Sequence, residues 1–173
     1  TYASSVTVGN KDNVLISGIE TSSEGYLVSA EADTGEKIWS TDAPEKVDNP
    51  RFNSHTIDSN GNIVAVGERY YSNTEYGFVL AKYTDQGNEI WNITRNKSTR
   101  FLSVATDNKN NIIVNGNIQN STKDFVVRKY SSDGKEMWST YYDSGGQDTA
   151  GSVKTNKNGD IFVSSRIDYQ DTI

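Results

Sequence analysis

His55 carries the only side chain in this sequence that changes charge near neutral pH without help from its surroundings. It could serve as a general base or as a metal ligand. The sequence has no cysteine and no second histidine. No other histidine is therefore present to complete a Ser–His site or a histidine cluster. Other repeats place Val6, Val104 and Val153 at the equivalent position. We therefore predict a half-buried histidine bonded to a neighbouring strand, with no catalytic residue, no cofactor site and no enzymatic activity.

Three polar turns place oxygen-bearing side chains at alternate positions, and such oxygens are the ligands that calcium prefers. They are residues 58–62 (DSNGN), 107–111 (DNKNN) and 156–160 (NKNGD). None has the full Asp-x-Asp-x-Asp-Gly pattern with a bidentate Glu downstream. Ordinary hairpin turns are the better interpretation, with calcium binding as the alternative.

The three tryptophans, Trp39, Trp91 and Trp138, could form a surface on which sugars stack. Each stands four residues after a glycine (Gly35, Gly87 and Gly134). This periodic placement favours a structural role, in which each indole packs between neighbouring repeats.

Five tyrosines break the repeat pattern and are candidates for binding loops. Exposed tyrosines combine an apolar ring with a polar tip, which suits contact with a carbohydrate or a protein. The alternative is that they fold against the strand edges. The candidates are Tyr70, Tyr71 and Tyr76, in the longest predicted loop between second and third strands, and Tyr141 and Tyr142, after a fourth strand.

Three Asn-x-Ser/Thr triplets make Asn92, Asn96 and Asn120 candidates for glycosylation. Asn96 and Asn120 fall in predicted loops, where a glycan could attach without disrupting strand pairing. Occupancy depends on whether the cell can glycosylate.

The composition is that of an acidic globular chain. Its net charge is −6 over 173 residues, and 34% of the residues are hydrophobic. Binding to nucleic acid needs a field of lysines and arginines, which this sequence lacks. Its apolar runs are too short for a membrane-spanning helix. The chain begins with Thr1, which suggests a processed or partial chain, so a missing signal peptide carries little weight.

These candidate residues belong to a repeat of about 49 residues. Its openers Val14, Ile63, Ile112 and Ile161 recur every 49 residues, and each begins a short apolar run. Gly18, Gly67 and Gly116 follow the first three openers by four residues, with Ser165 in the fourth place. The aromatic residues Tyr26, Phe78 and Phe125 stand thirteen residues before the three tryptophans.

Each repeat is predicted to form four strands, because its β-branched and aromatic runs are separated by Asn/Asp/Gly turns. In the third repeat the expected strands lie near residues 103–105, 112–116, 125–130 and 137–139. Four strands per 40–50 residues is the pattern of a β-propeller blade. The predicted repeats are residues 1–48, 49–98, 99–147 and 148–173, the last one incomplete.

The fold class is thus all-β, a β-propeller section of about three and a half four-stranded antiparallel blades. We expect it to be open or part of a larger ring, since propellers usually need at least four blades. Either a longer chain or a neighbouring subunit would cover the open blade edge, because an uncovered edge invites aggregation.

Residues 101–165 resemble the bacterial and archaeal propeller repeats called SBBP repeats. Their Lys-Tyr-…-Gly-…-Trp hairpin has its match in residues 82–91 and 129–138. Residues 30–39 (AEADTGEKIW) are similar to the tryptophan-docking motif of propellers of the pyrroloquinoline-quinone (PQQ) type. Both motifs are structural, so neither carries a catalytic residue over to this chain. The resemblance implies a secreted or surface context, including S-layer-like and adhesin-like proteins.

Together these observations favour a structural or recognition module of adhesion type at the cell surface or outside the cell. It would bind a protein or glycan partner through its loops, or associate with itself through the open blade edge. One alternative is a fragment of a propeller enzyme, either a quinone-dependent dehydrogenase or a glycosidase. Another is an intracellular scaffold, although the repeats lack the Gly-His and Trp-Asp pairs of that class.

Overall fold

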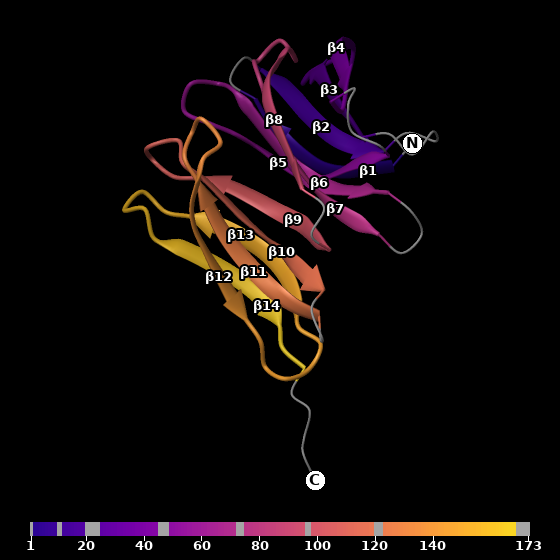
Figure 1. Cartoon of the computed structure of the whole chain (residues 1–173). Helices are drawn as coiled ribbons and strands as arrows, with labels where there is room; N and C mark the ends of the chain where they lie inside the picture. The colour runs from indigo at the N-terminus through magenta and orange to yellow at the C-terminus, as the bar shows by residue number, and fades with distance from the viewer. Residues whose placement is uncertain are drawn as a thin grey trace.

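The chain forms four antiparallel sheets that follow one another along the sequence (Figure 1). The computed structural model describes residues 2–9, 12–19, 25–44, 49–71, 75–95, 98–119 and 123–168. The first sheet contains β1 (Tyr2–Val8), β2 (Asn13–Ile19), β3 (Gly25–Glu31) and β4 (Lys37–Asp42). The second contains β5 (Pro50–Ile57), β6 (Ile63–Tyr70), β7 (Tyr76–Tyr83) and β8 (Glu89–Arg95). The third contains β9 (Thr99–Thr106), β10 (Ile112–Gln119), β11 (Lys123–Tyr130) and β12 (Glu136–Tyr142), and the fourth contains β13 (Thr149–Thr155) and β14 (Ile161–Arg166).

Within each sheet the strands pair in chain order, as consecutive hairpins require. Each sheet lies within one of the four predicted repeats. Pro50 opens β5, a position where its missing N–H costs no ladder hydrogen bond. No helix occurs in the part of the chain that the structure describes, and so none there is long and apolar enough to cross a membrane.

The repeated glycines of the second strands allow a close approach by the first strands. A Cβ on Gly67 would lie 1.7 Å from the carbonyl oxygen of Arg51, and one on Gly116 would lie 1.8 Å from that of Arg100. Both contacts occur beside a break in the register between the first and second strand. Any larger side chain would push the first strand away, so these glycines fix the path on which Arg51 and Arg100 lie.

The first sheet departs by one residue from the predicted alignment. Trp39 pairs with Ser29, whereas Trp91 pairs with Lys82 and Trp138 with Lys129. The β3–β4 turn is thus one residue longer than its counterparts. As a result, the alignment of Tyr26 with Phe78 is wrong: the Tyr26 position corresponds to Val79, because these residues pair with the equivalent glycines Gly18 and Gly67.

The hydrophobic cores lie between the sheets. Between the first and second sheets, Leu15 and Leu27 pack with Phe52 and Val79. The second and third sheets share a core of aliphatic and aromatic side chains that includes the tilted ring pair Phe78 and Phe101, with ring centroids 4.4 Å apart. The last core joins the third and fourth sheets: Ile113, Phe125, Val127, Ala105, Ala150 and Val153.

The sheets are arranged as in a propeller. The first strand of each later sheet packs across the first three strands of the sheet before it, so β1, β5, β9 and β13 lie innermost. The fourth strands, which are mostly exposed, form the outer edges. Packed this way, three four-stranded meanders and a two-stranded remainder make a section of a β-propeller. Its first and last sheets each keep one face open, where Val6 is 67% and Phe162 59% exposed.

Candidate functional site

The tyrosines predicted for a binding loop lie mostly in strands, at the end of the second sheet. Tyr70 and Tyr76 form the last pair of the β6–β7 ladder, with ring centroids 6.5 Å apart. Tyr71 follows β6 directly. The loop prediction was therefore wrong for Tyr70 and Tyr76, because the two strands keep pairing until their aromatic ends meet. All three tyrosines are partly buried.

Three arginines stack on these rings. The guanidinium carbon of Arg51, on β5, lies 4.7 Å from the Tyr70 ring centroid, and that of Arg100, on β9, lies 4.0 Å from the Tyr76 centroid. Arg69 stacks on Tyr71 at 3.9 Å. Each such contact contributes about 0.5–2 kcal/mol, depending on how far it is desolvated. We call these six residues, with Glu68, the arginine–tyrosine cluster.

The cluster carries more positive than negative charge. Glu68 is its only carboxylate, and the Glu68 Oε2 atom lies 3.2 Å from Arg100 Nε. The Tyr70 hydroxyl donates a hydrogen bond of 3.0 Å to the other oxygen of Glu68. Burial and the neighbouring Glu68 charge raise the pKa of Tyr70, so the hydroxyl keeps its proton.

Arg51 has no ion-pair partner among the described residues. Its Nε is buried, and no hydrogen-bond acceptor for it appears in the same part of the chain. Arg100 keeps 38% of its side chain exposed. A planar, donor-rich guanidinium held by stacking is well suited to bind a carboxylate.

Tyr141 and Tyr142 lie elsewhere, on the outer edge of the third sheet. Both belong to β12, so the prediction that they follow the fourth strand was wrong: β12 goes on pairing with β11 up to Tyr142. The Tyr142 ring stacks on Phe125 at 4.6 Å, and the Tyr141 hydroxyl accepts a 3.4 Å hydrogen bond from Arg128. They are 51% and 50% exposed.

His55 is more deeply buried than predicted, with only 4% of its surface exposed. Its Nδ1 lies 2.8 Å from the Ser17 hydroxyl on β2, so its partner is in the neighbouring sheet. Desolvation lowers the pKa of His55 to about 4, even though a backbone hydrogen bond at Leu15 raises it slightly. A substrate cannot reach this ring as it stands.

The oxygen-rich turns use their oxygens internally. Asp58 Oδ1 accepts hydrogen bonds from the backbone N–H groups of Asn60 and Asn62, and Asp58 Oδ2 lies 2.8 Å from Lys82 Nζ. Asp107 forms the same turn and pairs with Lys129 at 2.8 Å. These are hairpin turns whose carboxylates are already bonded.

A group that sequence reasoning missed could hold a cation. Among the described residues, Asp124, Asp143 and Asp148 can bring three carboxylate oxygens within 4.8 Å of one another. They lie near the start of β11 and between β12 and β13, so only the fold brings them together. Hydrogen bonds from the Ser144 N–H and hydroxyl hold Asp148 in place and lower its pKa. A hard cation such as calcium is the type of ion that would match these oxygens.

Two of the three tryptophans, Trp39 and Trp91, lie at seams between sheets. The Trp39 indole N–H donates a 3.1 Å hydrogen bond to the carbonyl oxygen of Asp85, in the β7–β8 turn. Its ring passes so close to Gly87 that a Cβ there would lie 2.8 Å from Trp39 Cε3, and the positive φ of Gly87 also favours glycine. Trp91 reaches the next such turn, at Gly134, whereas Trp138 is 38% exposed.

Of the three glycosylation candidates, Asn92 lies exposed on β8, where its side chain donates a 2.7 Å hydrogen bond to Glu89. Asn96 and Asn120 lie outside the described residues.

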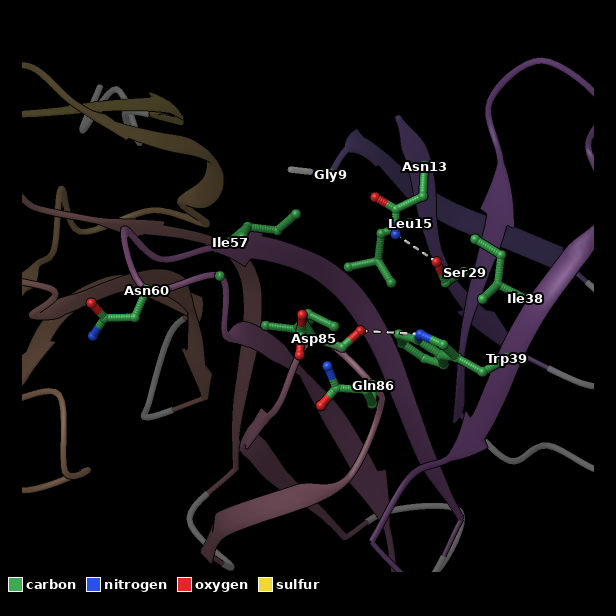
Figure 2. Close-up of a pocket in the computed structure, with 12 residues that line it drawn as sticks. Gly9, Asn13, Leu15, Ser29, Ile38, Trp39, Ile57, Asn60, Asp85 and Gln86 are labelled. Carbon is green, nitrogen blue, oxygen red and sulfur yellow. Dashed lines mark hydrogen bonds between the residues drawn. The ribbon is translucent and has the colours of Figure 1, made fainter. Parts of the chain in front are cut away.

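A cavity of about 290 Å³ lies between the first and second sheets, at the end opposite the arginine–tyrosine cluster (Figure 2). Trp39 forms part of its wall, and Asp85 and Gln86 lie across it from Asn13 and Ser29. The apolar part of the lining comes from Leu15, Ile38, Ile57 and Ile63. Sequence reasoning did not find this site, because its residues come from five strands and three turns.

Comparison with known proteins supports the fold. No family model matches the chain, so the resemblance to SBBP repeats stays an expectation. No curated protein matches it either. Among solved structures, the chain is similar to a protein of unknown function from Bacteroides caccae (17% identity, TM-score 0.57, covering 93% of this chain and 52% of that one). It is also similar to BamB from Moraxella catarrhalis (10% identity, TM-score 0.38, covering 91% and 56%).

The chain thus spans about half the length of the solved structures it matches. The likeness to the Bacteroides caccae protein agrees with the strand order and sheet packing, and it concerns the fold alone. The class that fold and site define is a section of a β-propeller with an arginine–tyrosine cluster at one end and a cavity at the other.

Proposed function

We propose that this chain is part of a recognition module that acts at the cell surface or outside the cell and binds an acidic glycan at the arginine–tyrosine cluster. The observation that carries the proposal is Arg51, a guanidinium stacked on Tyr70 with no ion-pair partner among the described residues. A carboxylate-bearing sugar would supply the missing charge. The tyrosine rings would offer it apolar surface.

The charge of the whole chain makes this cluster distinctive. The protein carries a net charge of −6, so a local excess of arginines forms a positive patch on an otherwise negative chain. Such a patch attracts an anionic partner electrostatically. Arg51 and Arg100 lie on innermost strands, which places the cluster at the end of the propeller near its axis.

A binding role is better supported than a catalytic one. His55 is buried and bonded to Ser17, and its pKa of about 4 keeps it neutral. The carboxylates of Asp58 and Asp107 are paired with lysines. These three side chains are thus occupied with holding the fold together.

The test is a titration of the purified chain with polygalacturonate, a polymer of carboxylate-bearing sugars, against neutral dextran as control. Arg51→Gln should weaken binding about tenfold or more, because a hydrogen bond to a charged group is worth about 1.5–3 kcal/mol. Arg166→Gln is the matched control, since the Arg166 side chain is 78% exposed and lies on β14. Binding should also weaken as salt is added.

Equal binding of dextran, or an Arg51→Gln variant that binds as well as the unaltered chain, would refute the proposal. Binding of polyglutamate without binding of polygalacturonate would show that the cluster recognises an acidic protein instead of a glycan.

A further inference from the structure

Lysine ammonium groups occupy matching places in the second and third sheets. Lys82, on β7, lies 2.8 Å from Asp58 Oδ2, and its Nζ also donates a 3.4 Å hydrogen bond to the backbone oxygen of Ser132 in the third sheet. The side chains of Lys82 and Asp58 are 7% and 0% exposed. In the third sheet, Lys129 pairs with Asp107 in the same way. The seam between the second and third sheets is therefore filled by a lysine.

The first sheet lacks both members of this pair. Ser29 stands in the place of Lys82, because Ser29 pairs with Leu15 and Lys82 with Val64, at equivalent points of the two ladders. Gly9 stands in the place of Asp58, since each directly follows its first strand and closes the same backbone turn. The seam between the first and second sheets thus has neither the ammonium group nor its carboxylate.

The 290 Å³ cavity lies where the missing pair would be, since both Gly9 and Ser29 line it (Figure 2). Asp85, whose backbone oxygen corresponds to that of Ser132, lines it as well. Among the lining residues that the structure describes, none is a lysine or an arginine and one, Asp85, is acidic. The cavity therefore combines the room for a lysine side chain with a negative charge.

The cavity contains a hydrogen-bond acceptor that lacks a donor in the described part of the chain. Asn13 Oδ1 is buried and has no hydrogen-bond partner among the described residues. Two donors beside it are already used: Asn13 Nδ2 donates to Ser29 Oγ at 2.7 Å, and the Trp39 indole N–H donates to the Asp85 backbone oxygen at 3.1 Å. An ammonium group, which has three donors and no acceptor, complements this set. The Trp39 ring adds a surface that attracts cations.

We infer that this cavity binds a primary alkylammonium group, such as the end of a lysine side chain or of a polyamine. The alkyl chain would lie against Leu15 and Ile63, as the Lys82 stem lies in the next seam. The ammonium group would face Asn13 Oδ1 and Asp85. This site is separate from the arginine–tyrosine cluster and takes a ligand of the opposite charge, so either proposal can fail without the other.

The test is an NMR titration of the chain with n-butylammonium, a mimic of the lysine side chain. The three tryptophans provide three indole N–H signals, assigned by Trp→Phe variants. The Trp39 signal should shift and saturate, while those of Trp91 and Trp138 stay in place. The neutral isostere n-butanol should shift the Trp39 signal at least tenfold more weakly. Shifts of all three signals together, no shift, or equal binding of n-butanol would overturn the inference.

Two variants sharpen the test. Gly9→Asp with Ser29→Lys rebuilds the pair of the second sheet inside the cavity and should abolish the butylammonium response. Gly9 has no positive φ, and the nearest atom to a Cβ there belongs to the movable Asn13 side chain, so the aspartate can be accommodated. Asp85→Asn needs no repacking and should weaken binding several-fold. Asp133→Asn, an acidic residue in the equivalent turn of the third sheet, is its matched control.

The inference would be overturned if both variants, Asp85→Asn and the double variant Gly9→Asp with Ser29→Lys, bound n-butylammonium as well as the unaltered chain does. A comparison of Nα-acetyl-lysine amide with spermidine then identifies the source of the ammonium group. Tighter binding of the lysine derivative points to a lysine side chain of a protein, and tighter binding of spermidine points to a free polyamine. Either result supports the ammonium site.

Discussion

Replacing Asp107 by asparagine should make the protein less stable at neutral pH but not at pH 2. Burial raises the pKa of Asp107, but hydrogen bonds from Lys129 and Asn111 outweigh it and bring the pKa from 3.8 to about 2. A carboxyl whose pKa is lower in the folded chain than in the unfolded chain stabilises the fold above the unfolded pKa. This contribution disappears as the pH falls from about 5 to about 2.

The size of the effect follows from the shift. A decrease from 3.8 to about 2 corresponds to about 2 kcal/mol at neutral pH, at about 1.4 kcal/mol per unit. Asparagine should keep the turn itself, because Asn156 closes the equivalent turn of the fourth sheet by accepting hydrogen bonds from two backbone N–H groups. The variant therefore keeps the backbone turn but replaces the oxygen that faces Lys129 and the Asn111 amide with an uncharged NH2 group.

The assay is urea unfolding followed by tryptophan fluorescence, from about pH 7 to about pH 2.5. The difference in unfolding free energy between the unaltered chain and Asp107→Asn should be about 2 kcal/mol at pH 7 and close to zero at the acid end. Asp33→Asn, at an exposed turn of the first sheet, is the control and should show no such trend. A difference that does not change with pH would refute the ion-pair reasoning.

Two further predictions concern the seams between sheets. Trp91 is partly buried against the core between the second and third sheets, so Trp91→Ala should cost part of the about 3–5 kcal/mol that is lost when a fully buried tryptophan is truncated. Trp138, which is 38% exposed, should cost clearly less when replaced by alanine, and equal shifts of the urea midpoint would contradict the packing. The ring protons of His55 should titrate near pH 4 when followed by NMR. Because the pKa of His55 is lower in the folded chain than in the unfolded chain, the stability that the neutral ring contributes is lost as the pH falls from about 6.5 to about 4. An NMR pKa near 6.5 would show that the ring is accessible to water.

The architecture was predictable because it depends on features that repeat. The 49-residue spacing, the apolar runs and the Asn/Asp/Gly turns led to four-stranded meanders, and the structure has them. The close approach of Gly67 and Gly116 to the first strands also follows a repeating position. The same residue types recur at the same positions in several repeats, so the strand pattern can be recognised from one sequence even where a single repeat departs from it.

What could not be predicted depends on departures from the repeat. One extra residue in the β3–β4 turn shifts β3 against the alignment, so the correspondence of Ser29 with Lys82 becomes visible only from the strand pairing. The cavity follows from that correspondence. Tyr70 and Tyr76 resemble loop residues in the sequence, because their contacts with Arg51 and Arg100 come from two other strands. A sequence signal did exist for the cavity: Gly9 stands where two other repeats have aspartate.

These departures also give each seam its own polar contact, and we expect this to fix the order of the sheets. His55 faces Ser17 at the first seam, whereas Asn117 donates a 3.1 Å hydrogen bond to the Asp148 backbone oxygen at the last. If the third sheet took the place of the second, Val104, the counterpart of His55, would face Ser17, and the Ser17 hydroxyl would lose its partner. A buried polar group left unpaired costs about 1–3 kcal/mol. Similar apolar cores would tolerate such an exchange, so the polar pairs are what discriminates between correct and exchanged neighbours.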